Sequence, residues 1–243
     1  MSKQKINKSA KETVKKKYFK KALKLGIVVV LFLLINLYII LSFIYQEKSF
    51  TVYLEHEDKI ERNLIIHETK DDKRYRYYLK ADILEDLSTT SLGWLPENLH
   101  TEADGSHNGN NYIAYTFYAE NIGQEAIAYK TEIILDDVIR NVDEALRIMV
   151  FKNDEKIVYA KTSSTTGQPE EGTKAFINEE IIMSERTENF EVGNVDKYTV
   201  VIFIEGNDAE CTDALIGGEV GVYMKLTEEK TIEPEEPLEG EEI

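Results

Sequence analysis

The densest group of side chains that could do chemistry follows a strongly apolar run late in the chain. Residues 197–213 read "KYTVVIFIEGNDAECTD", and the second half carries four acidic side chains and the only cysteine. The candidate oxygen ligands are Glu205, Asn207, Asp208, Glu210 and Asp213. Ca²⁺ takes about six to eight oxygen atoms, so these residues form a candidate Ca²⁺ site, although their spacing is not that of an EF-hand loop. The alternative is a tight turn in which Asp208 or Thr212 bonds backbone amides.

Cys211 is the candidate nucleophile of this segment. A cysteine reacts as its thiolate, and neighbouring carboxylates disfavour that charged form. Glu210 and Asp213 flank Cys211, and no histidine lies near it in the sequence. We therefore predict that Cys211 packs against the protein core and does not attack a substrate.

The histidines do not form a recognisable zinc motif. They are His56, His67, His100 and His107. Residues 56–60, "HEDKI", lack the second histidine of an HExxH motif, and a zinc site needs three or four ligands on rigid elements. We expect His100 and His107 to be solvated loop residues. The sequence also lacks a GxSxG motif and a glycine-rich phosphate loop before a helix, so we predict no catalytic residue and no cofactor beyond the candidate Ca²⁺.

A long apolar run lies near the N-terminus of the chain. Residues 25–45 read "LGIVVVLFLLINLYIILSFIY" and contain no charged side chain. At a rise of about 1.5 Å per residue, a helix of this length spans the roughly 30 Å hydrocarbon core of a bilayer. The competing interpretation is a cleaved signal peptide, but its apolar region is usually only about 7–15 residues long. No small-x-small pair follows the run either. We predict a retained transmembrane helix, with the lipid bilayer as a partner.

Charge is distributed unevenly along the chain. Residues 1–24 hold ten Lys and one Glu, a net charge of +9, so the remaining residues carry −25 within the total of −16. Basic flanks stay on the cytoplasmic side of a membrane, which predicts a single pass with the C-terminal domain outside the cell. The acidic outer part repels nucleic acid, so no nucleic-acid partner is expected. A single cysteine forms no internal disulfide, so a hydrophobic core must hold the outer domain together.

The outer part shows the two-residue alternation that is typical of strands. Residues 112–118, "YIAYTFY", place Ile113, Tyr115 and Phe117 on one face, and β-branched and aromatic residues dominate the neighbouring runs. A short helix is expected near residues 141–146, with Asn141 or Asp143 as its cap. About eight short strands separated by turns predict a mainly β fold, an antiparallel, jelly-roll-like β-sandwich.

These patterns divide the chain into segments of different character. The predicted segments are a cytoplasmic basic segment (1–24), a transmembrane helix (25–45), juxtamembrane strands and a loop that belong to the sandwich (46–105), the sandwich core (106–227) and a disordered acidic tail (228–243). Residues 100–111, "HTEADGSHNGNN", predict an exposed loop because they are polar and rich in Gly and Asn. The tail lacks aromatic residues and cannot bury enough apolar surface to fold.

Four stretches in the order "YTFYAENIGQEAIAYKTEI", "DEALRIMVF", "VYAK" and "KYTVVIFIEGNDAECTDALIGGEVGVYMKLT" cover about residues 106–227. This order resembles the TasA/camelysin-like exported proteins of Gram-positive bacteria. In that family an apolar-Glu-Gly strand end precedes an acidic turn, and a Gly-Gly pair leads into the last strand. The matching residues are Glu205, Gly206, Asp208, Cys211, Gly217 and Gly218. The resemblance implies a jelly-roll-like sandwich on the cell surface; some members are biofilm-matrix fibre subunits and some are named metallopeptidases.

Three functions are compatible with these features. The leading hypothesis is a membrane-anchored cell-surface protein whose non-catalytic sandwich is a structural or interaction module. Its partners would be other cell-envelope proteins, or further copies of itself joined by strand pairing. The first alternative is a camelysin-type metal-dependent peptidase, which needs histidines that converge with acidic residues. The second is a surface sensor that binds Ca²⁺ or another ligand.

Overall fold

The computed structural model describes residues 2–44, 49–56, 63–84 and 87–229, and the chain divides into two compact units, Met1–Glu47 and Lys48–Ile243. Residues 230–243, which hold most of the predicted disordered tail, lie outside the described residues, as does Tyr45 at the end of the predicted transmembrane run.

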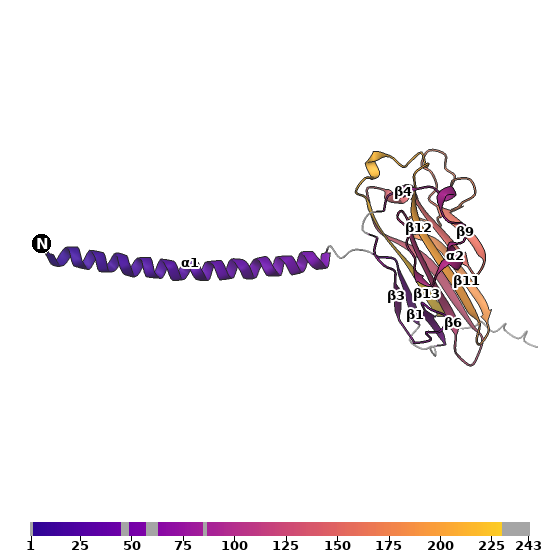
Figure 1. Cartoon of the computed structure of the whole chain (residues 1–243), viewed down its shortest axis with the longest axis horizontal. Helices are drawn as coiled ribbons and strands as arrows, with labels where there is room; N and C mark the ends of the chain where they lie inside the picture. The colour runs from indigo at the N-terminus through magenta and orange to yellow at the C-terminus, as the bar shows by residue number, and fades with distance from the viewer. Residues whose placement is uncertain (1, 45–48, 57–62, 85–86, 230–243) are drawn as a thin grey trace, which may run out of the picture. The chain divides into compact units, whose positions relative to one another are not determined.

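The first unit is a single helix, α1 (Ser2–Ile44), shown in indigo to purple in Figure 1. Its segment Lys15–Ile40 is long and apolar enough to cross a membrane, which agrees with the predicted apolar helix. The apolar side chains are exposed on every side of the helix, so it needs an apolar environment around it. The basic segment before residue 25 continues the same helix, because Lys and Ala favour helix and no Pro or Gly interrupts it.

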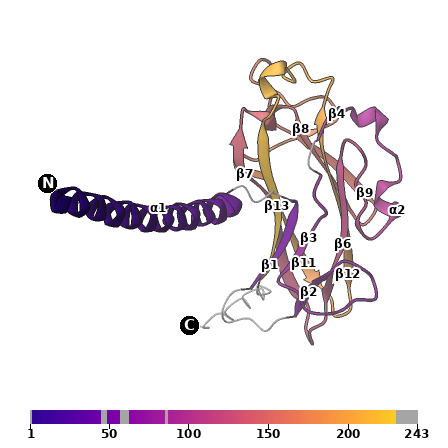
Figure 2. The same cartoon turned by 60° about the vertical axis from the view of Figure 1, so that its left-hand side comes forward.

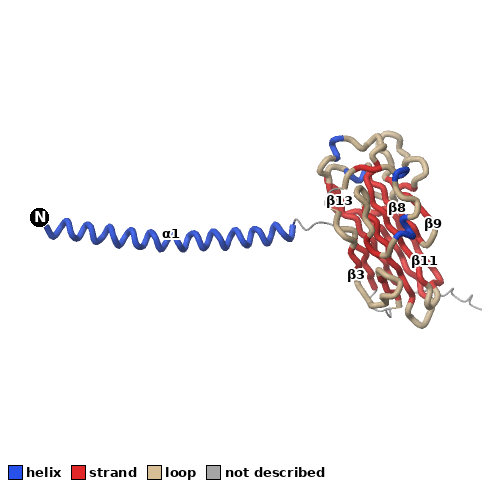
Figure 3. The backbone as a smooth tube through the Cα atoms, in the orientation of Figure 1, coloured by secondary structure: helices blue, strands red, loops and turns tan. Residues whose placement is uncertain are grey.

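The second unit is a β-sandwich, and this confirms the predicted mainly β fold (Figure 3). The five-stranded sheet has the order β11 (Ile181–Phe190), β7 (Ile127–Ile139), β13 (Glu219–Glu229), β1 (Thr51–His56) and β3 (Tyr78–Lys80). The eight-stranded sheet has the order β10 (Lys174–Ala175), β9 (Glu155–Ala160), β8 (Leu146–Lys152), β12 (Val195–Glu205), β6 (Ile113–Asn121) and β2 (Leu64–His67), with β4 (Thr89–Thr90) beside β12 and β5 (Gly105–Ser106) beside β6. Figure 2 shows β7, β13 and β1 in one layer of the sandwich and β6 and β9 in the other layer, with α2 (Leu99–Glu102) beside them.

Most neighbouring strands are antiparallel, as predicted, but β1 runs parallel to β13, β10 to β9 and β4 to β12. A tight hairpin forces two strands to be antiparallel, whereas strands far apart in the chain are free to pair in either direction. The segment after the predicted transmembrane helix is therefore part of the sandwich, because β1 lies between β13 and β3 in the five-stranded sheet.

Strand β12 is the central strand that its apolar sequence predicted. It pairs with β8 on one side and β6 on the other. Its alternate residues Tyr198, Val200 and Ile202 belong to the core between the sheets, while Val201 and Phe203 belong to a second apolar cluster on the outer face. A strand buried on both faces has to be apolar throughout, which explains the unbroken run "VVIFI".

The segment at residues 100–111, predicted as an exposed loop, contains regular structure in its first half, although residues 101–104 are exposed as predicted. The segment contains the rest of α2 and strand β5, which pairs with β6. Leu99, at the start of α2, is fully buried in the second apolar cluster together with Leu95. Burial of a leucine stabilises such a contact by about 1.5–3 kcal/mol, so Leu95 and Leu99 help to hold this polar segment against the sheet.

Two further boundaries differ from the prediction. The helix expected near residues 141–146 is one 3₁₀ turn, η2 (Val142–Glu144), because β8 begins at Leu146; Asn141 precedes it with a φ of 52° and makes no side-chain cap. Strand β13 continues to Glu229, past the boundary set at residue 227. Glu228 is buried there and its carboxylate accepts hydrogen bonds from the amides of Asn63 (3.1 Å) and Leu64 (3.1 Å).

The Gly217-Gly218 pair opens β13, as predicted, and the geometry at both positions requires glycine. Gly217 has a φ of +72°, which residues with a side chain rarely adopt. A Cβ atom on Gly218 would lie 2.9 Å from the carbonyl oxygens of Ile139 and Leu215. This pair therefore lets the loop turn tightly against the end of β7.

Candidate functional site

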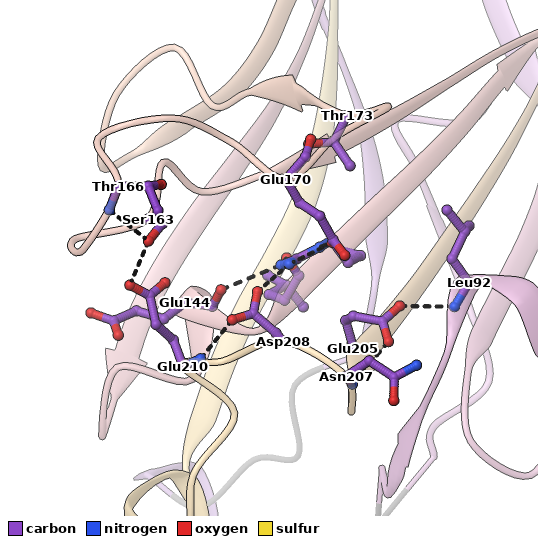
Figure 4. A network of polar contacts seen from close by, with 12 residues as sticks. Leu92, Glu144, Ser163, Thr166, Glu170, Thr173, Glu205, Asn207, Asp208 and Glu210 are labelled. Atoms are coloured by element: carbon purple, nitrogen blue, oxygen red, sulfur yellow. Dashed lines mark hydrogen bonds and ion pairs between the residues drawn. The ribbon is translucent and has the colours of Figure 1, made fainter.

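The acidic segment joins β12 to β13 and includes a short 3₁₀ turn, η3 (Asp213–Leu215). Figure 4 shows Glu205, Asp208 and Glu210 in contact with three other segments of the chain. Each carboxylate has a different partner, and the partners explain why this loop is acidic.

Glu205 ends β12, and its carboxylate is buried. It accepts hydrogen bonds from the amide of Leu92 (2.8 Å) and from the amide of Asn207 (3.0 Å). Leu92 begins the short 3₁₀ helix η1 (Leu92–Trp94). Residues 91–106 cover the outer face of the eight-stranded sheet, and we call them the cover. Glu205 thus ties the start of the cover to the end of the central strand.

Asp208 is the counter-ion of a buried arginine. Arg147 lies on β8 with 2% of its surface exposed, and its guanidinium donates to the carboxylates of Asp208 and Glu170 (2.9 Å). It also donates to the carbonyl oxygens of Glu144 (3.3 Å) and Leu146 (3.0 Å). A buried guanidinium is costly unless it is paired and hydrogen-bonded, so these contacts are needed for folding.

Glu210 bonds a third segment. Its carboxylate accepts hydrogen bonds from the hydroxyl of Ser163 (3.0 Å) and from the hydroxyl and amide of Ser164 (both 2.8 Å). The hydrogen bond from the Ser164 side chain is the main reason that the pKa of Glu210 lies below its ordinary value. The amide of Glu210 in turn donates to Asp208 (2.7 Å), as the turn interpretation predicted.

The remaining two candidate ligands point elsewhere. Asn207 donates from its amide side chain to the hydroxyl of Ser91 (3.0 Å), and Asp213 is exposed at the start of η3. Among the residues that the structure describes, no group of three or more His, Cys, Asp or Glu side chains could hold a metal ion. The five candidate oxygen ligands therefore do not gather at one point, and the Ca²⁺ site stays a prediction.

Cys211 is half-buried and packs against the main core, which confirms the predicted packing role. Burial raises the pKa of its thiol, and the carboxylates of Asp208 and Glu205 raise it further. The carboxylates that raise the pKa of the thiol are therefore Asp208 and Glu205, and not Glu210 and Asp213, which flank Cys211 in the sequence. The raised pKa leaves little of the reactive thiolate at neutral pH.

His100 and His107 take part in packing, while the side chain of His56 lies outside the described residues. His100 stacks on Phe151 with ring centroids 4.6 Å apart, and the ring nitrogens of His107 lie 3.0 Å and 3.2 Å from the carbonyl oxygens of Gly105 and Leu99. The prediction of solvated loop residues is therefore wrong for the location of His100, which lies in α2, whereas His107 lies in a loop as predicted; both are half-buried.

His67 is buried in the eight-stranded sheet. Its Nδ1 lies 2.8 Å from the carbonyl oxygen of Thr69, and its ring stacks on Tyr118 with centroids 5.4 Å apart. Its Nε2 lies 3.3 Å from a carboxylate oxygen of Glu120, an ion-pair distance without the geometry of a hydrogen bond. These described contacts are structural and do not favour the peptidase alternative.

A polar cluster between the two sheets was missed in the sequence. The hydroxyl of Tyr129 donates to Asp196 and lies 2.9 Å from the hydroxyl of Tyr198, and the ammonium of Lys152 lies 3.8 Å from Asp196. Burial raises the pKa of Tyr129, and Tyr198 and Asp196 raise it further. The alternation in β8 could have predicted this cluster, because Lys152 follows Ile148 and Val150 on the face that points into the core.

Comparisons with known proteins add no family. No family model and no curated protein matches the chain. A β-glucosidase from Kluyveromyces marxianus in complex with glucose is similar over 70% of this chain and 15% of its own, with 15% identity and a TM-score of 0.24. A selenomethionine-labelled structure of that β-glucosidase gives 10% identity over 66% of this chain and 17% of its own, with a TM-score of 0.25. The chain thus spans under a fifth of the length of these structures, and a likeness this low supports no conclusion.

Proposed function

We propose that this protein is a single-pass, membrane-anchored cell-surface protein whose β-sandwich is a non-catalytic structural or interaction module. The observation that carries the proposal is that one chain contains both a helix that is apolar on every side and a sandwich with its own hydrophobic core. The basic residues before the apolar run support a cytoplasmic N-terminus and a sandwich at the cell exterior. The resemblance to TasA/camelysin-like proteins agrees with such a location and stays a prediction.

Pairing with another chain through a sheet edge would use β11. Among the described edge strands, β3, β10 and β2 have only three, two and four residues, whereas β11 has ten. The free edge of β11 is partly protected by charged residues such as Arg186 and Glu188 and by two register irregularities against β7. Such features limit indiscriminate strand pairing, so a partner must match the sequence of β11.

Topology can be tested in cells that express the full chain with a tag at each end. We expect external protease to remove the C-terminal tag and to leave the N-terminal tag intact until the cells are lysed. The membrane fraction should retain the protein after an alkaline wash. Mass analysis should find residues 1–24 still attached; an N-terminus near Glu47 would instead identify α1 as a signal peptide and overturn the anchor.

Homotypic association can be tested with proteoliposomes that carry the full chain. Tethering in a membrane raises the local concentration, so weak contacts become observable as vesicle clustering. Clustering that is lost when Arg186 is replaced by proline would support pairing through β11, since proline removes a backbone donor. Vesicles that bind neither one another nor isolated cell envelopes would contradict an interaction role.

A further inference from the structure

The outer face of the five-stranded sheet carries a row of apolar side chains, with one side chain from each strand. In spatial order the row consists of Tyr78, Tyr53, Tyr223, Ile134 and Ile181. Tyr53 lies opposite Tyr78, Tyr223 opposite Ile134, and Ile134 opposite Ile181. Between β1 and β13 the row steps by two residues, since Thr51 lies opposite Tyr223. The rings of Tyr53 and Tyr223 are in contact, with centroids 5.8 Å apart and an angle of 85° between their planes. We call these five side chains the tyrosine row.

The tyrosine row faces away from the core. Val52, Leu79, Val222 and Ile133 are the next residues in their strands, and all of them are buried between the sheets. Because successive side chains of a strand point to opposite faces, the tyrosine row points outward. Tyr53 and Tyr78 are 45% and 60% exposed. Strands lie about 4.8 Å apart, so the row crosses roughly 19 Å of sheet.

Ion pairs within the chain neutralise the charges beside the row. Lys225 lies 3.5 Å from Glu55 and 3.4 Å from Glu132, and Lys130 lies 2.8 Å from Glu132. Further along, Arg186 lies 2.6 Å from Glu229. Arg186 also pairs with Glu188, so three cations stand beside four carboxylates, although residues 25–243 together carry a charge of −25. The charges beside the row are therefore nearly balanced on a strongly acidic domain.

We propose that the tyrosine row binds an extended chain of an uncharged polysaccharide, with sugar rings laid along the row. The C–H faces of a pyranose are apolar and gain from contact with aromatic side chains, while its hydroxyls can bond the phenol and the flanking charged groups. The perpendicular rings of Tyr53 and Tyr223 form a corner against which one sugar ring can rest. This inference rests on the proposed cell-surface location, where glycans are available.

The chemistry of the face favours an uncharged glycan over a protein or a second copy. The apolar strip is one side chain wide, and a protein laid over it would also cover the ion pairs of Lys225 and Lys130. Removing such pairs from water costs more than a narrow strip returns. A hydroxyl-rich glycan can replace the water at these groups and keep them solvated. An anionic polymer is not attracted to a face whose charges are nearly balanced, and the acidic domain around that face repels it.

The test uses the full chain in nanodiscs of phosphatidylcholine and measures its retention on insoluble cellulose, chitin and starch. We expect retention on at least one of them, weakened by about tenfold or more in Tyr53→Ala, as the loss of one aromatic contact implies. Tyr53→Phe should retain most of the binding because it keeps the ring. The matched control is Trp94→Ala, since Trp94 is 79% exposed but lies outside the row; its affinity should change by less than about twofold.

Each other outcome overturns the proposal. Absence of retention on all three polysaccharides would do so, as would an equal loss in Tyr53→Ala and Trp94→Ala. Self-association in nanodiscs that Tyr53→Ala abolishes would identify the row as a contact between copies. Circular dichroism and thermal unfolding of each variant show whether it is folded. Cell-surface location is measured separately by the protease experiment, so a failure of either proposal can be told apart from a failure of the other.

Discussion

The two outer faces of the sandwich carry apolar side chains in opposite situations. On the eight-stranded sheet, Met149, Phe151, Val201 and Phe203 lie under a segment that includes Leu95 and Leu99. On the five-stranded sheet, the tyrosine row has no such cover among the described residues, and ion pairs flank it. Apolar residues that a covering segment buries stabilise the fold, whereas apolar residues left exposed beside neutral ion pairs are available to a ligand.

The acidic loop belongs to the covered face. Arg147 lies opposite Phe203 on the neighbouring strand and therefore on the same outer face. Its charge would break the apolar cluster, and Asp208 and Glu170 neutralise it at the edge of that cluster. Glu205 fixes the start of the covering segment through Leu92. The residues that looked most like a metal site thus close one end of a second hydrophobic core.

The largest effect is expected from removing a side chain under the cover. Phe203→Ala should lower the free energy of unfolding by about 3–5 kcal/mol, because Phe203 is fully buried in the second apolar cluster. Denaturant unfolding of the full chain in detergent micelles, followed by near-ultraviolet circular dichroism, measures this loss. A loss below about 1 kcal/mol would show that the segment does not pack on the sheet as described.

Asp208→Ala tests the ion pair at the end of the covered face and the Ca²⁺ hypothesis together. We expect a loss of about 3 kcal/mol, because Arg147 stays buried with only Glu170 as its counter-ion. If the loop also binds Ca²⁺, the cation should raise the melting temperature of the wild type but not of Asp208→Ala. Equal melting temperatures with Ca²⁺ and with a chelator in the wild type would leave Asp208 with its structural role alone. Asp213→Ala is the matched control for the ion pair alone, since Asp213 is an exposed residue of the same loop but is also one of the five candidate Ca²⁺ ligands.

Glu205→Ala should loosen the cover without disturbing the open face. The amides of Leu92 and Asn207 lose their buried acceptor, which costs about 1–3 kcal/mol. Hydrogen exchange should accelerate in residues 91–106 and remain unchanged in β1 and β13. Equal acceleration in both sheets would mean that the two faces unfold as one unit and do not differ in local stability.

The strands, the central position of β12 and the glycine pair could be predicted because alternation and turn chemistry are local signals. The cover could not, since its buried residues Leu95 and Leu99 are separated by polar residues and only the sheet beneath them explains their burial. Arg147 was also missed, because its partners Glu170 and Asp208 are 23 and 61 residues away in the chain. The tyrosine row requires the register of five strands, which composition and periodicity do not determine.

A smaller effect separates the ion pairs of the open face from those of the covered face. Burial alone would raise the pKa of Glu132, but Lys130 and Lys225 lower it below its ordinary value of 4.5. A carboxyl with a lowered pKa stabilises the fold above its unfolded pKa, and that stability is lost as the pH falls through the folded pKa. Glu132→Gln should therefore cost at most about 1 kcal/mol at pH 7, since its partners Lys130 and Lys225 are partly exposed to water. The difference between the two proteins should vanish in acid, well below pH 4.5; a difference that persists there would indicate lost packing.

The smallest change in stability is expected on the tyrosine row, where the proposed effect on binding is largest. Tyr53→Ala removes an exposed ring that touches Tyr223, so the free energy of unfolding should change by no more than about 0.5–1 kcal/mol. This compares with the loss of several kcal/mol expected for the buried Phe203. The two variants, unfolded under the same conditions, measure directly what a covering segment contributes to an aromatic side chain on a sheet. A loss in Tyr53→Ala as large as that in Phe203→Ala would mean that the row is part of the folding core, and it would no longer be a surface kept for a ligand.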